Sequence, residues 1–278
     1  MKISRATLSA WIGIAGVAAV WAGLGAEAGA EAVDFEPDAE TIGAFFPQRA
    51  DPDAMRKRGF FATGLTPVYP SGAACFEANS LFASTTRGDG SGRTRRFYAG
   101  YHGGLDIPAP EGTPIIAVAD GIVVHLAEGD GIGGIGVVLQ HAPEQTGLPV
   151  WTYTEYKHLR EMPGLEIGRK VKRGEVIAFV GKTGTVGSRA YGAAGHAHLH
   201  LSAWYGATDK FRSARMLTPK DGHWLDPLAL FRGPPAASGE IEKLPTAAKK
   251  VPLPYKAADG RIVPAETKVV WPLVCAAK

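Results

Sequence analysis

The stretch Gly121-Ile122-Val123-Val124-His125-Leu126 is decisive for the fold class, because it is a short run of aliphatic and β-branched residues that starts at a glycine. Runs of the same kind precede and follow it, at residues 113–118, 136–141, 150–154 and 175–180. Short strands with turn signals at this spacing are typical of an all-β sandwich or barrel, and not of alternating βαβ units. We therefore predict an all-β fold, either a sandwich or a barrel.

The predicted domain occupies residues 75–232, and irregular extensions flank it on both sides. Residues 31–74 are acidic at first and then proline-rich, which predicts a linker with little regular structure. Residues 233–278 are rich in Pro, Ala and Lys and hold too few apolar residues for a core of their own. The more apolar segment 268–275 is expected to dock on the domain.

The first 30 residues predict export. Lys2 and Arg5 precede an apolar stretch that ends near residue 25, and small residues follow in Ala26-Glu27-Ala28. This order is typical of a secretory signal peptide, whereas about 20 apolar residues can also span a bilayer as an uncleaved signal anchor. Both alternatives place the remaining chain outside the cytoplasm, in the periplasm or the extracellular space.

The two cysteines, Cys75 and Cys275, stand far apart in the sequence. Outside the cytoplasm such a pair predicts a disulfide, and two unrelated buried thiols are the alternative. Closing so long a loop contributes roughly 4–5 kcal/mol in the chain-entropy model. The net charge of +3 is small and no basic stripe is present, which argues against a nucleic-acid partner.

Three of the eight histidines crowd into residues 195–201. On a strand, alternate residues share a face, so His196, His198 and His200 point one way and the apolar residues between them point the other way. Three imidazoles on one face need hydrogen bonds or a metal, and zinc favours neutral imidazole ligands. The cluster therefore indicates a zinc site.

A second cluster is His102-Gly103-Gly104-Leu105-Asp106. On a straight strand the Cα atoms of His102 and Asp106 lie ~13 Å apart, too far to share one ion, and a bend at the two glycines brings them together. If His198 and His200 both ligate as well, the site is a closed structural one. If only one of them does, a position stays open, as in a catalytic site. Spacing alone does not choose between these alternatives.

Taken in order, these motifs resemble those of the lysostaphin/LytM-type zinc endopeptidases, which cut peptide bonds in bacterial peptidoglycan. The resemblance covers about residues 75–232. The matching motifs are H-x-G-x-D at 102–106, Y-x-H-L at 156–159, a glycine-containing strand at 171–181, H-L-H at 198–200 and the domain end Leu225-Asp226-Pro227.

The resemblance implies an antiparallel β-sandwich with its site in a groove. It implies that His102, Asp106 and His200 hold one zinc ion per chain and leave the fourth position to water. His158 and His198 are then the catalytic histidines that move the proton of this water. Some relatives also use a tyrosine upstream of the first ligand, a role that falls to Tyr98 or Tyr101 here.

The chain departs from the family pattern at several positions. The segment 186–194 is longer than usual, Ala197 replaces a common proline, and Leu201-Ser202 stands where Phe-Glu is frequent. These departures concern the groove wall and therefore the substrate preference. His196 is an additional histidine, either a groove residue or an auxiliary ligand. The histidines predicted to be structural are His125, His141 and His223.

The expected function is hydrolysis of the peptide cross-links of peptidoglycan by a monomeric zinc endopeptidase, with stem peptides as substrate. The alternative is a non-catalytic wall-binding module or an activator of other wall hydrolases, because some relatives have lost metal ligands. All three ligand positions and both catalytic positions are occupied here, which favours the enzyme. Contact with a membrane is expected only if the N-terminal segment is retained.

Overall fold

The computed structural model describes residues 32–129, 133–185 and 195–278. The predicted signal segment, residues 1–30, and the segment 186–194 before the histidine-rich strand lie outside the described residues. None of the helices in the described ranges combines the length and the apolar character that crossing a membrane requires.

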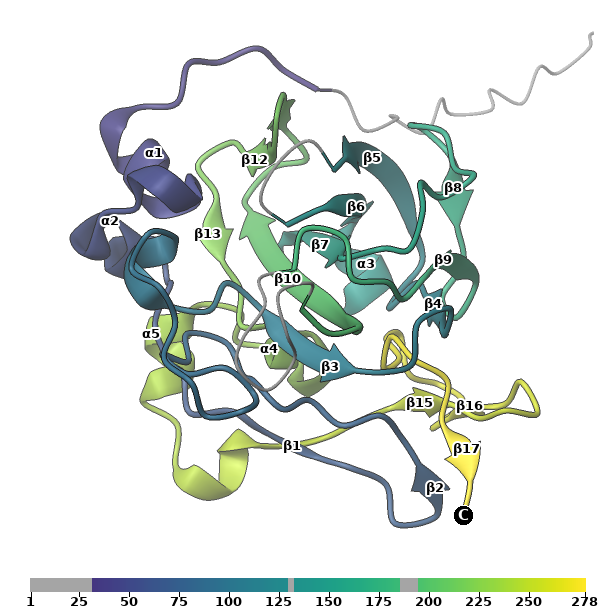
Figure 1. Cartoon of the computed structure of the whole chain (residues 1–278). Coiled ribbons are helices and arrows are strands. Elements are labelled where there is room, and N and C mark those ends of the chain that lie inside the picture. Colours follow the sequence, from purple (N-terminus) through teal and green to yellow (C-terminus); the bar gives the residue numbers. More distant parts are fainter. Residues whose placement is uncertain (1–31, 130–132, 186–194) are drawn as a thin grey trace, which may run out of the picture.

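The largest element of the fold is a seven-stranded antiparallel sheet (Figure 1). Its strand order is β13-β10-β7-β6-β5-β8. β13 pairs with residues 204–205 of β10, and β3 pairs antiparallel with residues 198–201 of the same strand. The strands are β3 (Leu105–Pro108), β5 (Gly121–Glu128), β6 (Ile135–His141), β7 (Trp151–Lys157), β8 (Lys170–Val171), β10 (His198–Gly206) and β13 (His223–Trp224). The prediction of an all-β, antiparallel fold is confirmed.

Smaller elements surround this sheet within the described ranges. The two-stranded sheets are β1 (Thr66–Val68) with β14 (Lys250–Pro252), β2 (Ala73–Ala74) with β17 (Ala276–Ala277), β4 (Pro114–Ile116) with β9 (Val176–Phe179), β11 (Phe211–Ser213) with β12 (Leu217–Pro219), and β15 (Tyr255–Lys256) with β16 (Ile262–Val263). The α-helices are α1 (Ala39–Phe45), α2 (Pro52–Lys57), α3 (Pro143–Thr146), α4 (Pro227–Arg232) and α5 (Ser238–Glu242). Single 3-10 turns are η1 (Pro47–Arg49), η2 (Tyr98–Gly100) and η3 (Thr246–Lys249).

The main sheet has an apolar cluster on each face, because side chains alternate along its strands. On β10, Leu199 and Leu201 belong to one cluster, which also contains residues of β4, β9 and the C-terminal segment. Trp204 belongs to the other cluster, which contains residues of the N-terminal extension. By the same alternation His198 and His200 share the face of Trp204. The histidines of β10 therefore lie on the face that the N-terminal extension covers.

The N-terminal extension has more regular structure than its composition predicts, so the expectation of an irregular linker was wrong for this part of the chain. It contains α1 and α2, which begin after Asp38 and Asp51. Each aspartate side chain accepts a hydrogen bond from a backbone N–H three residues later, as N-cap residues do. Phe45 and Phe60 are buried in the second cluster. A few large apolar residues suffice here because they pack on an existing sheet and need no core of their own.

The C-terminal segment docks on the domain, as predicted for residues 268–275. Trp271 and Leu273 are fully buried in the first cluster, so the tail contributes to the core of the domain instead of remaining an irregular extension. The predicted disulfide between Cys75 and Cys275 is confirmed. It joins positions 200 residues apart, and restricting so large a loop in the unfolded chain stabilises the fold by about 2–5 kcal/mol. The packed unit thus extends beyond residues 75–232 on both sides.

Candidate metal centre

The bend predicted at Gly103-Gly104 is present directly before β3 and brings His102 close to Asp106. Gly104 has to be small, because a Cβ atom at this position would collide with the backbone of β10. Asp106 of β3 lies opposite His200 of β10 in the register of the two strands. Residues that are directly opposite in an antiparallel pair point to the same face. Two strands and one bend therefore bring the three side chains together.

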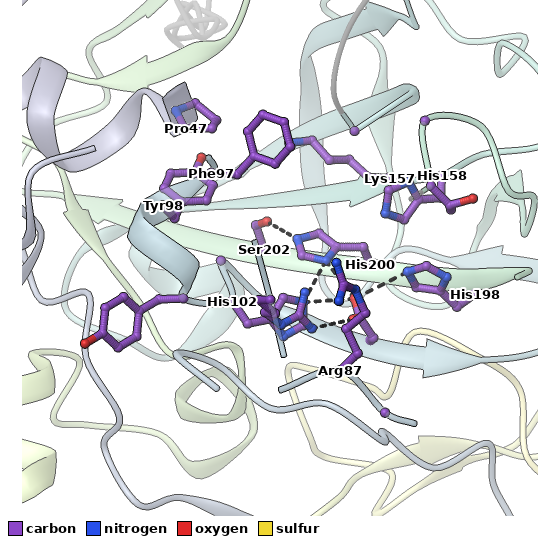
Figure 2. A pocket seen from close by; sticks show the side chains of 18 of the residues that line it. Pro47, Arg87, Phe97, Tyr98, His102, Lys157, His158, His198, His200 and Ser202 are labelled. Atoms are coloured by element: carbon purple, nitrogen blue, oxygen red, sulfur yellow. Dashed lines mark hydrogen bonds and ion pairs between the residues drawn. The ribbon is translucent and has the colours of Figure 1, made fainter. Parts of the chain in front are cut away.

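Three potential ligand atoms converge at this point (Figure 2). His102 Nε2 lies 2.9 Å from Asp106 Oδ1 and 3.1 Å from His200 Nδ1, and the last two atoms are 2.8 Å apart. In a tetrahedral zinc site with bonds of about 2.0–2.1 Å, neighbouring ligand atoms are roughly 3.3 Å apart. The three atoms have nearly this spacing. Among the described residues, His198 and His158 do not belong to the converging group.

The outer ring nitrogens of the two histidines point away from the converging atoms and donate hydrogen bonds. His102 Nδ1 lies 3.0 Å from the carbonyl oxygen of Leu81, which can only accept, so this nitrogen carries the proton. His200 Nε2 is hydrogen-bonded to Ser202 Oγ at 3.0 Å, and the hydroxyl accepts this bond in the tautomer that leaves Nδ1 free to bind a metal. The inner nitrogens are then unprotonated, and together with Asp106 three acceptors face one another. Such a group requires a cation or a proton between its members, so these residues fit a metal ion.

The ionisation of Asp106 and His200 suits ligation. Burial acts to raise the pKa of the Asp106 carboxyl, but its interactions with the rings of His102, His198 and His200 hold this pKa well below its usual range. Burial lowers the pKa of His200 to about 3. Both groups are therefore deprotonated at neutral pH, the state in which they bind a metal.

Arg93 contacts the candidate site, and sequence reasoning missed it. Its Nη2 lies 3.0 Å from Asp106 Oδ2 and 2.7 Å from Ser80 Oγ, so it holds the carboxylate by the oxygen that does not face the histidines. Arg93 stands in a segment rich in Gly, Ser and Arg, in which no spacing marks one arginine. Only the tertiary structure reveals this ion pair.

His158 and His198 flank the converging atoms. Their ring centroids lie 4.6 Å apart, and the ring of His158 lies 5.7 Å from that of His200. His158 Nδ1 donates to the carbonyl oxygen of Thr183 at 2.8 Å, and His198 Nδ1 donates to that of His196 at 3.0 Å. In the neutral form of each ring, Nε2 is therefore the unprotonated nitrogen and can accept a proton.

Two further observations distinguish His158 from His198. Burial, reinforced by the charges of His198 and His200, lowers the pKa of His158 well below its usual range. Burial also acts to lower the pKa of His198, but the hydrogen bond and the charge of Asp106, whose Oδ1 is 3.4 Å from His198 Nε2, raise it. His158 also has a left-handed backbone with φ of 63°, a strained conformation that is common at functional sites.

The remaining histidines do not join the converging group. The ring of His196 stacks on that of His198 at 4.5 Å and lines the cavity of the site, in agreement with a groove residue. His141 is fully buried and bonded through both ring nitrogens, and burial lowers its pKa to about 4. His223 stacks on Tyr205 at 5.2 Å. These two positions agree with their structural interpretation.

The site opens into a cavity of about 170 Å³ whose lining includes both candidate tyrosines. The hydroxyl of Tyr98 donates to the carbonyl oxygen of Phe45 at 3.1 Å and is thus engaged with the N-terminal extension. Tyr101 is 41% exposed. The geometry favours Tyr101 as the tyrosine that is available to a ligand, and its role remains a prediction.

Ser202 provides a test of the metal centre. The sequence suggests a groove-wall residue, but Ser202 is buried and accepts the Nε2–H hydrogen bond of His200. The signal available in the sequence was the spacing, because Ser202 follows His200 by two residues and therefore lies on the same face of the strand. Ser202→Ala is expected to lower zinc affinity by about 10- to 100-fold, because it releases a ligand from its orientation. Ser202→Thr is expected to restore most of the affinity.

Competition with a chromophoric chelator measures this affinity. Ser84→Ala is the matched control, because Ser84 is half-buried and its side chain bonds only within its own turn, to Thr86. Equal zinc affinity of the Ser202→Ala and Ser84→Ala proteins would show that Ser202 does not orient a ligand.

Comparison with known proteins gives matches in the central part of the chain. The model of peptidase family M23 matches residues 100–211. The chain is 38% identical over 102 residues to the DD-carboxypeptidase/endopeptidase Mpg of Neisseria meningitidis serogroup B, a match that covers 37% of this chain and 20% of that protein. It is 40% identical over 83 residues to an uncharacterized metalloprotease of Haemophilus influenzae, covering 30% of this chain and 16% of that protein. The chain thus matches about a fifth of the length of these curated relatives.

Solved structures with similarity include LytU, at 27% identity and a TM-score of 0.32, covering 40% of this chain and 68% of that one. A zinc-containing peptidase from Vibrio cholerae is 25% identical with a TM-score of 0.34, covering 49% of this chain and 34% of that one.

Proposed function

Because residues 100–211 of this chain form a peptidase M23 domain of the lysostaphin/LytM type, we propose that the protein is a zinc-dependent endopeptidase that hydrolyses the peptide cross-links of bacterial peptidoglycan. The observation that carries this proposal is the convergence of His102 Nε2, Asp106 Oδ1 and His200 Nδ1, beside two further histidines. A purely structural cluster would not need two additional imidazoles whose Nε2 atoms are free to take up and release a proton.

The proposed mechanism divides the work among five side chains. His102, Asp106 and His200 would hold the zinc ion, which would supply the Lewis acidity needed to activate a water molecule and polarise the scissile carbonyl. His158 is neutral and accepts the proton of the attacking water at Nε2. His198, whose pKa Asp106 raises, returns a proton to the leaving amine. Two neighbouring groups with pKa values shifted apart are the arrangement that acid–base catalysis uses.

Two observations support the substrate and the location. The name of the Neisseria relative, a DD-carboxypeptidase/endopeptidase, supports wall stem peptides as the substrate class. The disulfide between Cys75 and Cys275 supports a location outside the cytoplasm, because disulfides persist in oxidising compartments. We propose an exported, periplasmic or extracellular protein that acts as a monomer.

The purified protein is expected to digest isolated peptidoglycan, to lose this activity with a chelator and to regain it with zinc. Mass spectrometry of the released fragments measures the digestion and identifies the bond that is cut. Full digestion by protein from which all metal has been removed would contradict the proposal. Binding to the wall without digestion, together with stimulation of other wall hydrolases, would support the non-catalytic alternative instead.

A further inference from the structure

One of the candidate metal ligands is held by an arginine that lies outside the region matched by the M23 model. We propose that Arg93 is a positioning residue, which restricts Asp106 to a single metal-facing oxygen and thereby keeps a coordination position open. The M23 model matches residues 100–211, and Arg93 precedes this region. The inference rests on the zinc site of the proposed function and names a residue that controls its geometry.

The two carboxylate oxygens of Asp106 have different partners. Oδ1 lies 2.9 Å from His102 Nε2 and 2.8 Å from His200 Nδ1, so it belongs to the converging group. Oδ2 accepts a hydrogen bond from Arg93 Nη2 at 3.0 Å. A carboxylate binds a metal through one or through both of its oxygens. The contacts of Asp106 assign Oδ1 to the metal and Oδ2 to the arginine.

The guanidinium of Arg93 is held by more than this ion pair. Nη2 also donates to Ser80 Oγ at 2.7 Å, and Nε donates to the carbonyl oxygen of Thr86 at 3.2 Å. The side chains of Arg93 and Asp106 are only 18% and 11% exposed, so water has little access to the pair. Because a guanidinium is planar and rigid, a group bonded on two of its nitrogens cannot follow a rotating carboxylate. Rotation of Asp106 would therefore break a buried, charge-assisted hydrogen bond.

The backbone fixes where Arg93 stands. Thr86 and Gly92 form an antiparallel bridge, which closes a hairpin directly before Arg93. Ser80 connects this hairpin to the ligand strand, since its carbonyl oxygen accepts from the backbone N–H of Asp106 at 3.0 Å. The hydroxyl of Ser80 donates to the carbonyl oxygen of Thr86 at 3.1 Å and accepts from Arg93. The ligand and the residue that holds it are thus attached to the same short segment.

The number of donor atoms shows why this contact matters. If Oδ2 were free, both oxygens of Asp106 could turn toward the ion, and together with His102 and His200 they would supply four donor atoms. A tetrahedral zinc site with four protein donors is closed, whereas a catalytic site keeps one position for water. With Oδ2 bound to Arg93, three donor atoms remain. Arg93 therefore favours the open form of the site.

Anchoring of the hairpin is the alternative role for Arg93, and the electronic spectrum of cobalt(II) separates the two. The visible bands of cobalt(II) are strong in a four-coordinate site, which has no centre of symmetry, and weaken when further donors bind. The metal-free full chain is titrated with cobalt(II), and the molar absorbance of the saturated protein is measured. In Arg93→Met it is expected to fall to less than half of the wild-type value, because Oδ2 becomes a donor in addition to water. Arg93→Gln, which also lacks the charge, is expected to show the same loss.

Matched variants locate the effect. Arg93→Lys keeps a cation for Oδ2, so its spectrum is expected to stay closer to that of the wild type than to that of Arg93→Met. Arg95→Met removes the same charge two residues later in the chain. Because Arg95 is exposed and does not line the metal-site cavity, this variant is expected to keep the wild-type spectrum. Thermal unfolding of each metal-free protein measures stability separately, and a residue that only anchors the hairpin lowers Tm without changing the spectrum.

An unchanged spectrum in Arg93→Met or Arg93→Gln, or an equal loss in Arg95→Met, would overturn the inference. Failure of both neutral Arg93 variants to fold would also overturn it, since the ion pair would then serve stability. The proposed function fails separately, because the spectra require no hydrolysis. A protein whose spectrum responds to Arg93→Met but that digests no peptidoglycan refutes only the hydrolase. A hydrolase whose spectrum does not respond refutes only the role of Arg93.

Discussion

His200→Ala is expected to abolish zinc binding and hydrolysis together, whereas His158→Ala is expected to keep the zinc and lose turnover. His200 supplies one of the three converging atoms, so its removal leaves two ligands. His158 lies outside this group, and its unprotonated Nε2 is the proposed proton acceptor. Loss of a general base lowers turnover by about 10²- to 10⁴-fold. Metal content by mass spectrometry and the rate of peptidoglycan digestion distinguish the two effects.

His198→Ala decides between the open and the closed site. His198 Nε2 lies 3.4 Å from Asp106 Oδ1 but outside the converging group, so this variant is expected to retain zinc. Loss of zinc from it would instead establish a fourth ligand and contradict the open catalytic site. His223→Ala is the control, because His223 lies on β13 and stacks on Tyr205 of β10, and its removal is expected to affect neither zinc nor rate. A His158→Ala protein with normal turnover would refute the proposed general base.

Phe60→Ala is expected to lower the free energy of unfolding by about 3–5 kcal/mol, the usual cost of truncating a buried phenylalanine. The ring centroid of Phe60 lies 4.4 Å from that of Trp224 and 5.1 Å from that of Phe82. Trp224 in turn donates from Nε1 to the backbone of α1 and lies against Gly103, next to the first ligand. The N-terminal extension therefore packs, through Trp224, against the segment that carries the first ligand. Urea unfolding followed by fluorescence measures the change.

Phe61→Ala is the matched control, because Phe61 is only partly buried and lies outside the core clusters, with Arg56 over its ring. It is expected to cost about 1 kcal/mol or less. Deletion of residues 32–61 is expected to abolish folding and activity. A truncated protein that folds and digests faster than the full chain would show that this extension is a latency device and not a part of the core.

The strands of the main sheet could be predicted because their signal is local. Alternating or continuous apolar runs bounded by glycine, such as residues 121–126 and 136–141, indicate strands whatever their partners are. The N-terminal extension could not be predicted in this way. Its helices are short, and Phe45 and Phe60 acquire their role only by packing against Trp224, which is far along the chain. Tertiary contacts determine the structure of such segments more than local propensity does.

The ligands of the candidate metal centre could be predicted from the sequence for a related reason. His102 and Asp106 are linked by a glycine bend, and His198 and His200 alternate on one strand, so each pair has a local pattern. The residues that orient these ligands have no such pattern. Arg93 lies in a segment rich in Gly, Ser and Arg and pairs with Asp106. The carbonyl oxygen of Leu81 accepts a hydrogen bond from His102, which is 21 residues later in the chain.

The sequence by itself determined the all-β class and the disulfide partners, and it predicted the histidines and the aspartate of the candidate site, because these depend on residue type and short-range spacing. The tertiary structure decided which atoms of that set converge, since the register of β3 on β10 places Asp106 opposite His200 and leaves His198 outside the converging group. It also decided that both extensions belong to the packed unit. Strand register, side-chain burial and cavities arise from contacts between distant segments, which short-range patterns do not encode.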